Sequence, residues 1–484
     1  MTRSCMCAIG LLLVVAGATG RGAPNAEARS EAFDSLRDLL AQFEMDSAFF
    51  QQFEDSASLS AEEMQPIARL MYQLQRVPPV DVQRWSRTGD DARAALADVD
   101  AHRGELVSLA GQIIRVDRQT LDQAQADDAP DKNLLRCTLR IDQRLDVFVL
   151  TSRVPSAWPI GQAIDYRAAC HAMPLKQIVD GDRQTPLVLA AHLAWYPPTL
   201  LGDLGMDASL FENVQNRKPI RAEEREAFYQ MLSAVGRADP AKTEQVAESE
   251  IRRLQQELPK RIRQATSAES RTLLEHALQR AEQGTSDVVG LFNQPESQHG
   301  QLKLLEGICR RAIEIHVDDS DIVQRFGIRK YFEIELFTSD AQSNPITVCT
   351  LSLPKQLPRG DNLYERVRLA GFFFKTWSYP LTSIADAPNP RRSGQSKNQL
   401  APLLIAPRVT WLSSAPAPLT FSATVAVLLI GLISVALFYT ATRLFRGRRG
   451  ALARLDSSTG IDDSSARSAL ARLESSNEQT PDST

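Results

Sequence analysis

One strand-like segment occurs twice in this chain, and the repeat to which it belongs covers most of the length. PLVLAAHLAW begins at Pro186 and PLLIAPRVTW begins at Pro402, with Pro, Leu, Ala and Trp at matching positions. Further matches follow in the same order at offsets that grow from 161 to 216 residues: Phe50 with Phe211, Glu63 with Glu224, Gly104 with Gly300, Gly111 with Gly307, Lys176 with Lys375, and Trp195 with Trp411. A preserved order with a growing offset indicates a duplication with insertions. Because the period is about 200 residues, it indicates duplicated domains and not a solenoid of short repeats.

Each copy begins with a helical pattern. In the first copy Ser60 is followed three residues later by Glu63, which is the spacing of a capping box, and apolar residues then recur at helical intervals. The repeated pairs Glu62-Glu63 and Glu223-Glu224 are interpreted as acids in the first turn of a helix, where the helix dipole favours them, against the alternative of paired catalytic carboxylates. The second copy adds about 35 residues of charged helical sequence, which we interpret as a short helical hairpin.

Each copy then changes to strand patterns. The first copy offers five candidates, LVSLAGQIIRV, LLRCTLRI, LDVFVLTS, AIDYRAACHA and LVLAAHLAW, and the second copy offers five at corresponding places. Alternating apolar positions and β-branched residues support these strands. A glycine inside the first strand of each copy lets a long strand bend around a corner. Five such strands in about 100 residues therefore predict a small closed barrel.

This strand order resembles the OB fold, a five-stranded Greek-key barrel, over roughly residues 104–196 and 300–412. A Pro-Gly connector, VPSAWPIG or LPKQLPRG, replaces the helix that OB folds carry between the third and fourth strands. The resemblance implies an α+β fold class with two duplicated units, each a helical part plus an OB-like barrel, followed by one transmembrane helix. The whole design is similar to uncharacterised membrane-anchored envelope proteins of bacteria, and that resemblance implies no activity.

Two apolar segments predict export and membrane anchorage. The N-terminus has a basic residue, an uncharged run centred on residues 11–15 and then small residues, which is the pattern of a secretory signal peptide. Residues 419–442 carry no charge, and a helix of that length spans about 36 Å, enough to cross a bilayer. Arginines follow at once at positions 443, 446, 448 and 449, and such clusters stay in the cytoplasm. We therefore expect a single-pass cell-membrane protein with its N-terminal part outside the cytoplasm.

The predicted domains follow in order along the chain: a signal peptide (1–28), a helical segment (29–103), a first OB-like domain (104–198), a second helical segment (199–299), a second OB-like domain (300–412), the transmembrane helix (419–442) and a disordered cytosolic tail (443–484).

Four cysteines remain beyond the signal peptide, namely Cys137, Cys170, Cys309 and Cys349. An oxidising compartment permits disulfides between them, and that possibility stays open. The two copies do not place them at equivalent positions, and each lies in an apolar strand-like stretch, so free buried thiols are favoured. Because the sequence has no CxxC pair and no Cys/His cluster, we predict no metal site and no cofactor.

A search for reaction motifs finds none. The sequence lacks GxSxG, a Walker loop and GxGxxG, and its six histidines share no metal-ligand spacing. The segment from His316 to Asp319 comes nearest to a ligand cluster and is interpreted as a solvated loop after a strand. No catalytic residue is therefore predicted.

The segment GFFFKTWSY has the most unusual local composition, because five aromatic residues surround one lysine. Aromatic rings and a cation on one surface can stack sugars or bases. Two other interpretations stay open, in which the rings fill the core or meet lipid headgroups. The candidate ligand contacts are Phe372, Phe374, Lys375, Trp377 and Tyr379.

We expect a non-enzymatic envelope protein that binds a partner or organises a complex. The alternative is a carbohydrate- or peptide-binding protein that uses the aromatic segment, and a hydrolase is the third possibility. The expected partners are membrane lipid around the single helix and an unknown envelope protein or saccharide. Nucleic acid is not an expected partner, because the net charge is −4 and the barrels are predicted to lie outside the cytoplasm.

Overall fold

The computed structural model describes residues 33–55, 58–119, 134–180, 183–342, 344–380, 398–412 and 431–441. We call the described residues up to 199 the first half and those from 200 to 412 the second half. Both halves belong to one unit, Met1–Ser413. The signal peptide predicted over residues 1–28 and the tail predicted over residues 443–484 lie outside the described residues.

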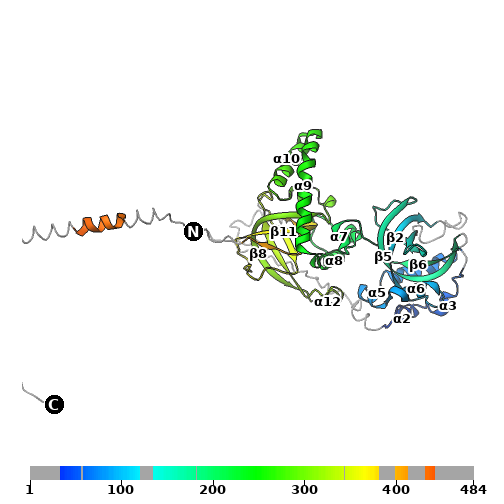
Figure 1. Ribbon diagram of the computed structural model, residues 1–484. Helices are drawn as coiled ribbons and strands as arrows, with labels where there is room; N and C mark the ends of the chain where they lie inside the picture. The colour runs from blue at the N-terminus through cyan, green and yellow to red at the C-terminus, as the bar shows by residue number, and fades with distance from the viewer. Residues whose placement is uncertain are drawn as a thin grey trace, which may run out of the picture. The chain divides into compact units, whose positions relative to one another are not determined.

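The first half combines short helices with a seven-stranded sheet (Figure 1). Its helices are α2 (Leu36–Ala41), α3 (Ser47–Phe50), α4 (Met64–Leu74), α5 (Pro79–Trp85) and α6 (Gly89–Ala97). Its strands are β1 (Ser86–Arg87), β2 (Leu106–Arg118), β3 (Leu135–Arg140), β4 (Asp146–Thr151), β5 (Ala163–Asp180), β6 (Arg183–Ala190) and β7 (Ala194–Trp195). The strand order is β1-β2-β3-β4-β6-β5-β7, and β2 also pairs with β5.

The second half combines helices with a six-stranded sheet. Its helices are α7 (Leu200–Asp203), α8 (Arg225–Gly236), α9 (Pro240–Gln264), α10 (Ala268–Glu282), α11 (Val289–Asn293) and α12 (Ser320–Phe326), with 3-10 turns η2 (Ala208–Asn213), η3 (Ala222–Glu224) and η4 (Pro295–Ser297). Its strands are β8 (Leu302–His316), β9 (Lys330–Phe337), β10 (Ile346–Thr350), β11 (Glu365–Pro380), β12 (Asn398–Ile405) and β13 (Thr410–Trp411). The strand order is β12-β10-β9-β8-β11-β13, and β12 also pairs with β11.

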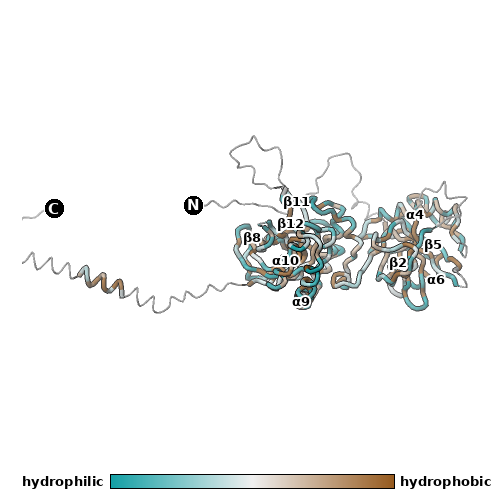
Figure 2. The backbone as a smooth tube through the Cα atoms, turned by 90° about the horizontal axis from the view of Figure 1, so that it is seen from above, coloured by the Kyte–Doolittle hydropathy of each residue, from teal (hydrophilic) through white to brown (hydrophobic). Residues whose placement is uncertain are grey.

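One amphipathic helix closes the core of each half. The apolar stripe of α4, predicted from its spacing, is fully buried and packs with Leu187 and Leu189 of β6. The stripe of α8 packs in the same way with Leu403 and Ile405 of β12. Hydrophobic residues follow the strands of both sheets in Figure 2. Because each buried leucine or methionine contributes about 1.5–3 kcal/mol, these two helices hold much of each core together.

The two sheets repeat the same register where the sequence repeats. β2 places Ser108 opposite His171 of β5, and β8 places Leu304 opposite Ala370 of β11. The long strands also carry bulges at corresponding places, just before Lys176 in β5 and just before Lys375 in β11.

The glycine inside the first long strand of each sheet lies against a neighbouring backbone. A Cβ atom at Gly111 would come within 2.2 Å of the Arg140 carbonyl oxygen, and one at Gly307 within 2.4 Å of the Phe337 carbonyl oxygen. The close approach of two strands therefore requires glycine at both positions.

The helical insertion predicted in the second copy is present as α9 and α10, which lie side by side and project from the second sheet (Figure 1). The two helices form the expected hairpin, and α9 continues through Pro259. Its apolar face meets β8 and β11 through Ala247 and Ile251.

The predicted pair of closed five-stranded barrels is wrong. The described strands form one seven-stranded and one six-stranded sheet in an α+β structure. The sequence patterns missed the two-residue strand β1, which pairs with β2, and predicted one strand where the chain forms two, β6 with β7 and β12 with β13. Strands of two residues are too short to show any periodicity, so a pattern of five segments could not reveal them.

The transmembrane helix predicted over residues 419–442 is not seen, and this part of the predicted fold class is also wrong. Of that segment the structure describes only residues 431–441, which are helical. Among the described residues, none of the helices has both the length and the apolar character that crossing a membrane requires.

The four cysteines beyond the signal peptide are free and buried, as the sequence favoured. Burial raises the pKa of Cys170 to about 12 and raises the pKa of Cys349 well above its ordinary value. These thiols therefore remain protonated at neutral pH and act as small apolar side chains.

Candidate functional site

A cavity of about 710 Å³ lies over the first sheet. Its floor is formed by Ser108 of β2 and by Ala169 and His171 of β5. One wall comes from α5 and the start of β1, and the opposite wall comes from α8 and α12 of the second half. The helix α5 ends at Trp85, and the chain continues as β1, whose Ser86 lines the cavity.

His171 is exposed within this cavity although it stands on a long central strand. Its Nδ1 atom is hydrogen-bonded to the Ser86 hydroxyl at 2.7 Å, which fixes the ring against β1. Partial burial lowers the pKa of His171, and the nearby His192 lowers it further. The imidazole is therefore neutral at pH 7 and offers hydrogen bonds instead of a charge.

A second histidine lines the cavity beside an aspartate and a serine. His192 Nε2 lies 2.6 Å from one carboxylate oxygen of Asp207 and 3.4 Å from the Ser209 hydroxyl. A catalytic triad needs the carboxylate on one ring nitrogen and the hydroxyl on the other. Because both groups meet Nε2, and Ser209 donates to Asp207 at 2.7 Å, this cluster is not arranged as a nucleophile and base.

Charged side chains on the second-half wall neutralise one another. Arg325 donates to both carboxylate oxygens of Glu226, at 2.8 and 2.6 Å, and also to Asp321. Arg225 donates to Asp321 at 2.7 Å, which extends the network from α8 to α12. Bidentate pairs of this kind are rigid and satisfied, so the wall is preformed and presents little uncompensated charge to a ligand.

A buried ion pair joins the helical part to the sheet in both halves. Lys176 Nζ donates to Glu63 at 2.6 Å, and Lys375 Nζ donates to Glu224 at 2.7 and 2.8 Å. Both lysines are fully buried. Burial lowers the pKa of Lys375, and the hydrogen bond to Glu224 opposes that shift.

The same glutamates also accept a backbone hydrogen bond from the turn before their helices, which in the first copy is one half of the predicted capping box; α4 itself begins after Glu63, without a side-chain cap. Glu63 accepts from the backbone N–H of Ser60 at 2.8 Å, and Glu224 accepts from the backbone N–H of Arg221 at 3.2 Å. The sequence missed their lysine partners, although both members of each pair recur between the copies. The available signal was that the repeat preserves both a glutamate, at positions 63 and 224, and a lysine, at positions 176 and 375.

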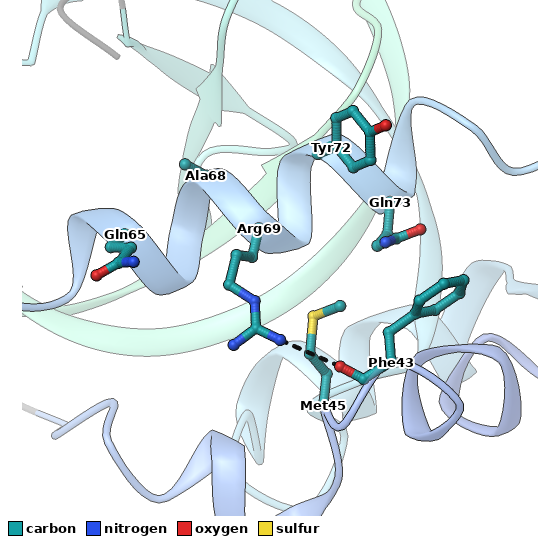
Figure 3. A pocket seen from close by; sticks show the side chains of 7 residues that line it. All are labelled: Phe43, Met45, Gln65, Ala68, Arg69, Tyr72 and Gln73. Atoms are coloured by element: carbon teal, nitrogen blue, oxygen red, sulfur yellow. Dashed lines mark hydrogen bonds between the residues drawn. The ribbon is translucent and has the colours of Figure 1, made fainter. Parts of the chain in front are cut away.

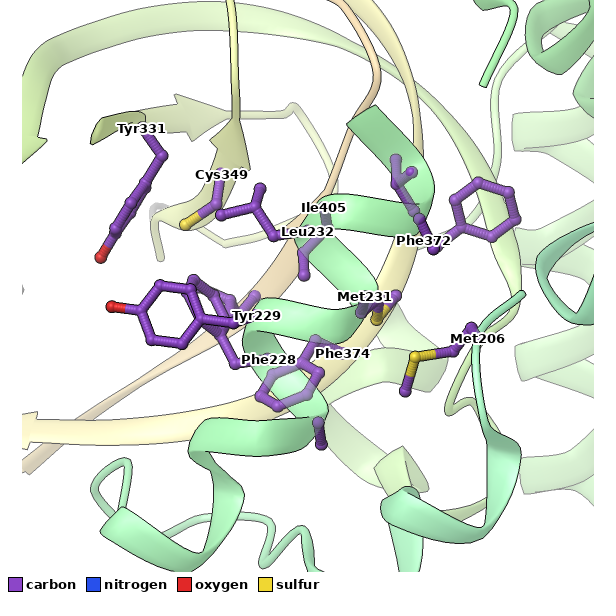
Figure 4. Close-up of a cluster of buried hydrophobic side chains, with 14 of the residues drawn as sticks. Met206, Phe228, Tyr229, Met231, Leu232, Tyr331, Cys349, Phe372, Phe374 and Ile405 are labelled. Atoms are coloured by element: carbon purple, nitrogen blue, oxygen red, sulfur yellow. The ribbon is translucent and has the colours of Figure 1, made fainter. Parts of the chain in front are cut away.

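All five predicted ligand contacts lie inside the second half. Phe372 and Phe374 belong to the cluster beneath α8 that includes Phe228 and Met231 (Figure 4). Lys375 is the partner of Glu224. The rings of Trp377 and Tyr379 contact each other in a tilted arrangement at 4.9 Å between ring centroids, and the two residues are 8 % and 7 % exposed. A ligand would have to displace α8 to reach these rings, so their role as contacts stays a prediction.

A shallower pocket of about 440 Å³ lies on the outer face of α4 (Figure 3). Arg69 donates to the carbonyl oxygen of Phe43 at 3.2 Å, and the rings of Phe43 and Tyr72 are exposed. Its walls carry few polar groups that converge on one point. The cavity over the first sheet is therefore the better candidate site.

The segment from His316, the last residue of β8, to Asp319 does not gather metal ligands. The imidazole lies 3.4 Å from Glu314, whereas Asp319 caps α12 and binds Arg225. In the part of the chain that the structure describes, we find no group of three or more His, Cys, Asp or Glu side chains suited to a metal ion.

Comparisons with known proteins give no family. No family model matches the sequence. No curated protein matches it either. Among solved structures, the enzymatic component C2-I of the C2-toxin from Clostridium botulinum is 11 % identical, with 80 % of this chain and 91 % of that chain covered, at a TM-score of 0.10. Similarity at that level carries no argument about fold or activity.

Proposed function

We propose that this protein is a non-enzymatic binding protein and that the cavity over the first sheet is its binding site. One observation carries the proposal: the corresponding face of the second sheet is covered by α9, whereas the first sheet leaves Ser108 and His171 facing an open space. A concave site with mostly apolar walls and a few polar groups is the usual form of a ligand site.

The polar groups of the cavity favour binding over chemistry. His171 is held by Ser86, His192 is held by Asp207, and Arg325 is held by two carboxylates. Each of these groups has a defined partner that orients it. Such groups fix the position of a ligand, but none is placed to activate a nucleophile.

Photocrosslinking in cells tests this proposal. A photoreactive benzoylphenylalanine is introduced at position 171 of the full chain, with the exposed position 144 as the matched control. We expect a discrete adduct from position 171 that disappears when Ser108→Trp fills the cavity. No adduct, or an adduct that persists with Ser108→Trp in a folded protein, would overturn the proposal, and so would turnover of a substrate in the cavity.

A further inference from the structure

We propose that the cavity receives an amphipathic helix of a partner protein, in the place that α9 takes over the second sheet. This inference rests on the proposed binding function and narrows the ligand to a helical segment. The inference follows from comparing, residue by residue, the sheet face that α9 covers in the second half with the corresponding sheet face of the first half.

The floors of the two surfaces correspond in register. Ser108 lies opposite His171 in the first sheet, and Leu304 lies opposite Ala370 in the second. The sequence repeat gives the same correspondence independently, because 304 minus 108 is 196 and 370 minus 171 is 199, the offsets of the flanking matches. The two pairs therefore stand on the same face of the same strands.

The floor of the second sheet is covered by a helix. Leu304 and Ala370 are 0 % and 6 % exposed and share one apolar cluster with Ala247 and Ile251 of α9. These two α9 residues are four positions apart and so lie on one side of the helix.

Ion pairs fix the direction of α9 on that floor. Arg368 of β11 donates to Glu244 and to Glu248 of α9, each at 2.8 Å. The apolar contact and the flanking ion pairs together define how a helix sits on this surface.

The floor of the first sheet lacks this helix because the corresponding helix is short. Pro79 begins α5 and Pro240 begins α9, and the two prolines differ by the offset of 161 residues. The helix α5 ends after seven residues, whereas α9 continues for 25. At the same offset Ser86 of β1 takes the place of Ala247 and contacts His171, but the first half has no continuous helix there in the position of α9.

The floor left open is suited to a helix with a partly polar face. Ala169 and Leu106 leave room for small apolar residues spaced like Ala247 and Ile251, and Leu210 adds an apolar contact from the second half. Ser108 and His171 stand where leucine and alanine stand in the second sheet. The bound helix should therefore carry a hydrogen-bonding side chain between its apolar residues.

A peptide with the sequence of residues 240–264 of this chain provides a defined probe. The full-length protein is titrated into the fluorescein-labelled peptide and followed by fluorescence anisotropy and circular dichroism. We expect saturable binding with a gain in helicity. Ser108→Trp and Ala169→Trp should each weaken binding by about tenfold or more, whereas Arg144→Trp should leave it unchanged.

A second peptide with Ala247→Asp and Ile251→Asp tests the apolar face and should not bind. Binding that survives both cavity variants means that the peptide has displaced α9 itself, and that result overturns the inference. Absence of binding by folded protein also overturns it. If position 171 still yields its photocrosslinked adduct, the binding function stands and only the helical ligand is excluded; if neither signal appears, both proposals fail.

Discussion

The two halves fasten their helices to their sheets in the same way but use the outer face of the sheet differently. Glu63–Lys176 and Glu224–Lys375 join corresponding elements in both, whereas only the second half covers its floor with a long helix. A contact kept in both copies is explained by folding alone. The surface that differs is the open floor of the first half, and the proposed binding site rests on this contrast.

The largest expected effect comes from breaking the shared ion pair. Glu224→Gln leaves the fully buried Lys375 without a counter-charge and should lower the free energy of unfolding by about 3–5 kcal/mol. Glu63→Gln should act in the same direction with a smaller loss, because Lys176 uses only one oxygen of Glu63. Urea unfolding measures both. The exposed neighbour Glu223→Gln is the control, and a loss below about 1 kcal/mol for Glu224→Gln would contradict a shared structural role.

Exchanging the corresponding residues of the two floors should reduce stability in the second half and leave it almost unchanged in the first. Leu304→Ser places a hydroxyl beneath α9 and should cost about 3 kcal/mol. Ser108→Leu adds an apolar side chain to an open cavity and should change stability by less than about 0.5 kcal/mol. Thermal unfolding of the two variants measures the contrast. Equal losses would mean that the first floor is covered after all.

The buried acid Glu333 belongs to the second sheet and should make the stability of the protein depend on pH between about 4.5 and 7. Burial raises the pKa of Glu333 to about 7, and Arg311 at 2.9 Å opposes that shift. Between the ordinary pKa of 4.5 and about 7 the folded chain keeps a proton that the unfolded chain releases, so stability should fall as pH rises through this window.

Glu333→Gln should remove this dependence, so that its stability relative to the parent protein rises by about 2–3 kcal/mol between pH 4 and pH 8. In the first sheet Arg136 stands where Glu333 stands in the second. Arg136 lies opposite Asp117 and Glu333 lies opposite Ile313, and positions 117 and 313 differ by the repeat offset of 196. Arg136→Gln is therefore the matched control. A difference that stays constant with pH for Glu333→Gln would refute the assignment.

The smallest expected difference between the halves concerns the strand glycines. Gly111→Ala and Gly307→Ala each force a Cβ atom against a carbonyl oxygen of the neighbouring strand. Each should cost about 1–2 kcal/mol, and the two losses should be similar. Gln112→Ala, at an exposed position of the same strand, is the control for urea unfolding. A loss in only one half would show that the strands do not approach equally closely.

Local patterns predicted the helices and long strands well but misjudged the candidate site. The aromatic segment around Lys375 drew attention because of its composition, and its side chains are buried. The cavity was missed, although a signal existed: the repeat places Ser108 and His171 where the other copy has Leu304 and Ala370. A polar residue that replaces an apolar one between copies marks a face with a different neighbour.

By itself the sequence determined the order of the elements and the correspondence between the two copies, because periodicity acts over a few residues and the repeat is visible in the residues themselves. Only the tertiary structure decided that the strands form seven- and six-stranded sheets, that Lys176 meets Glu63 across 113 residues, and which sheet face stays open. These outcomes depend on contacts between segments far apart in the chain. Short-range patterns carry no record of such contacts, because burial and ion pairing are decided by packing.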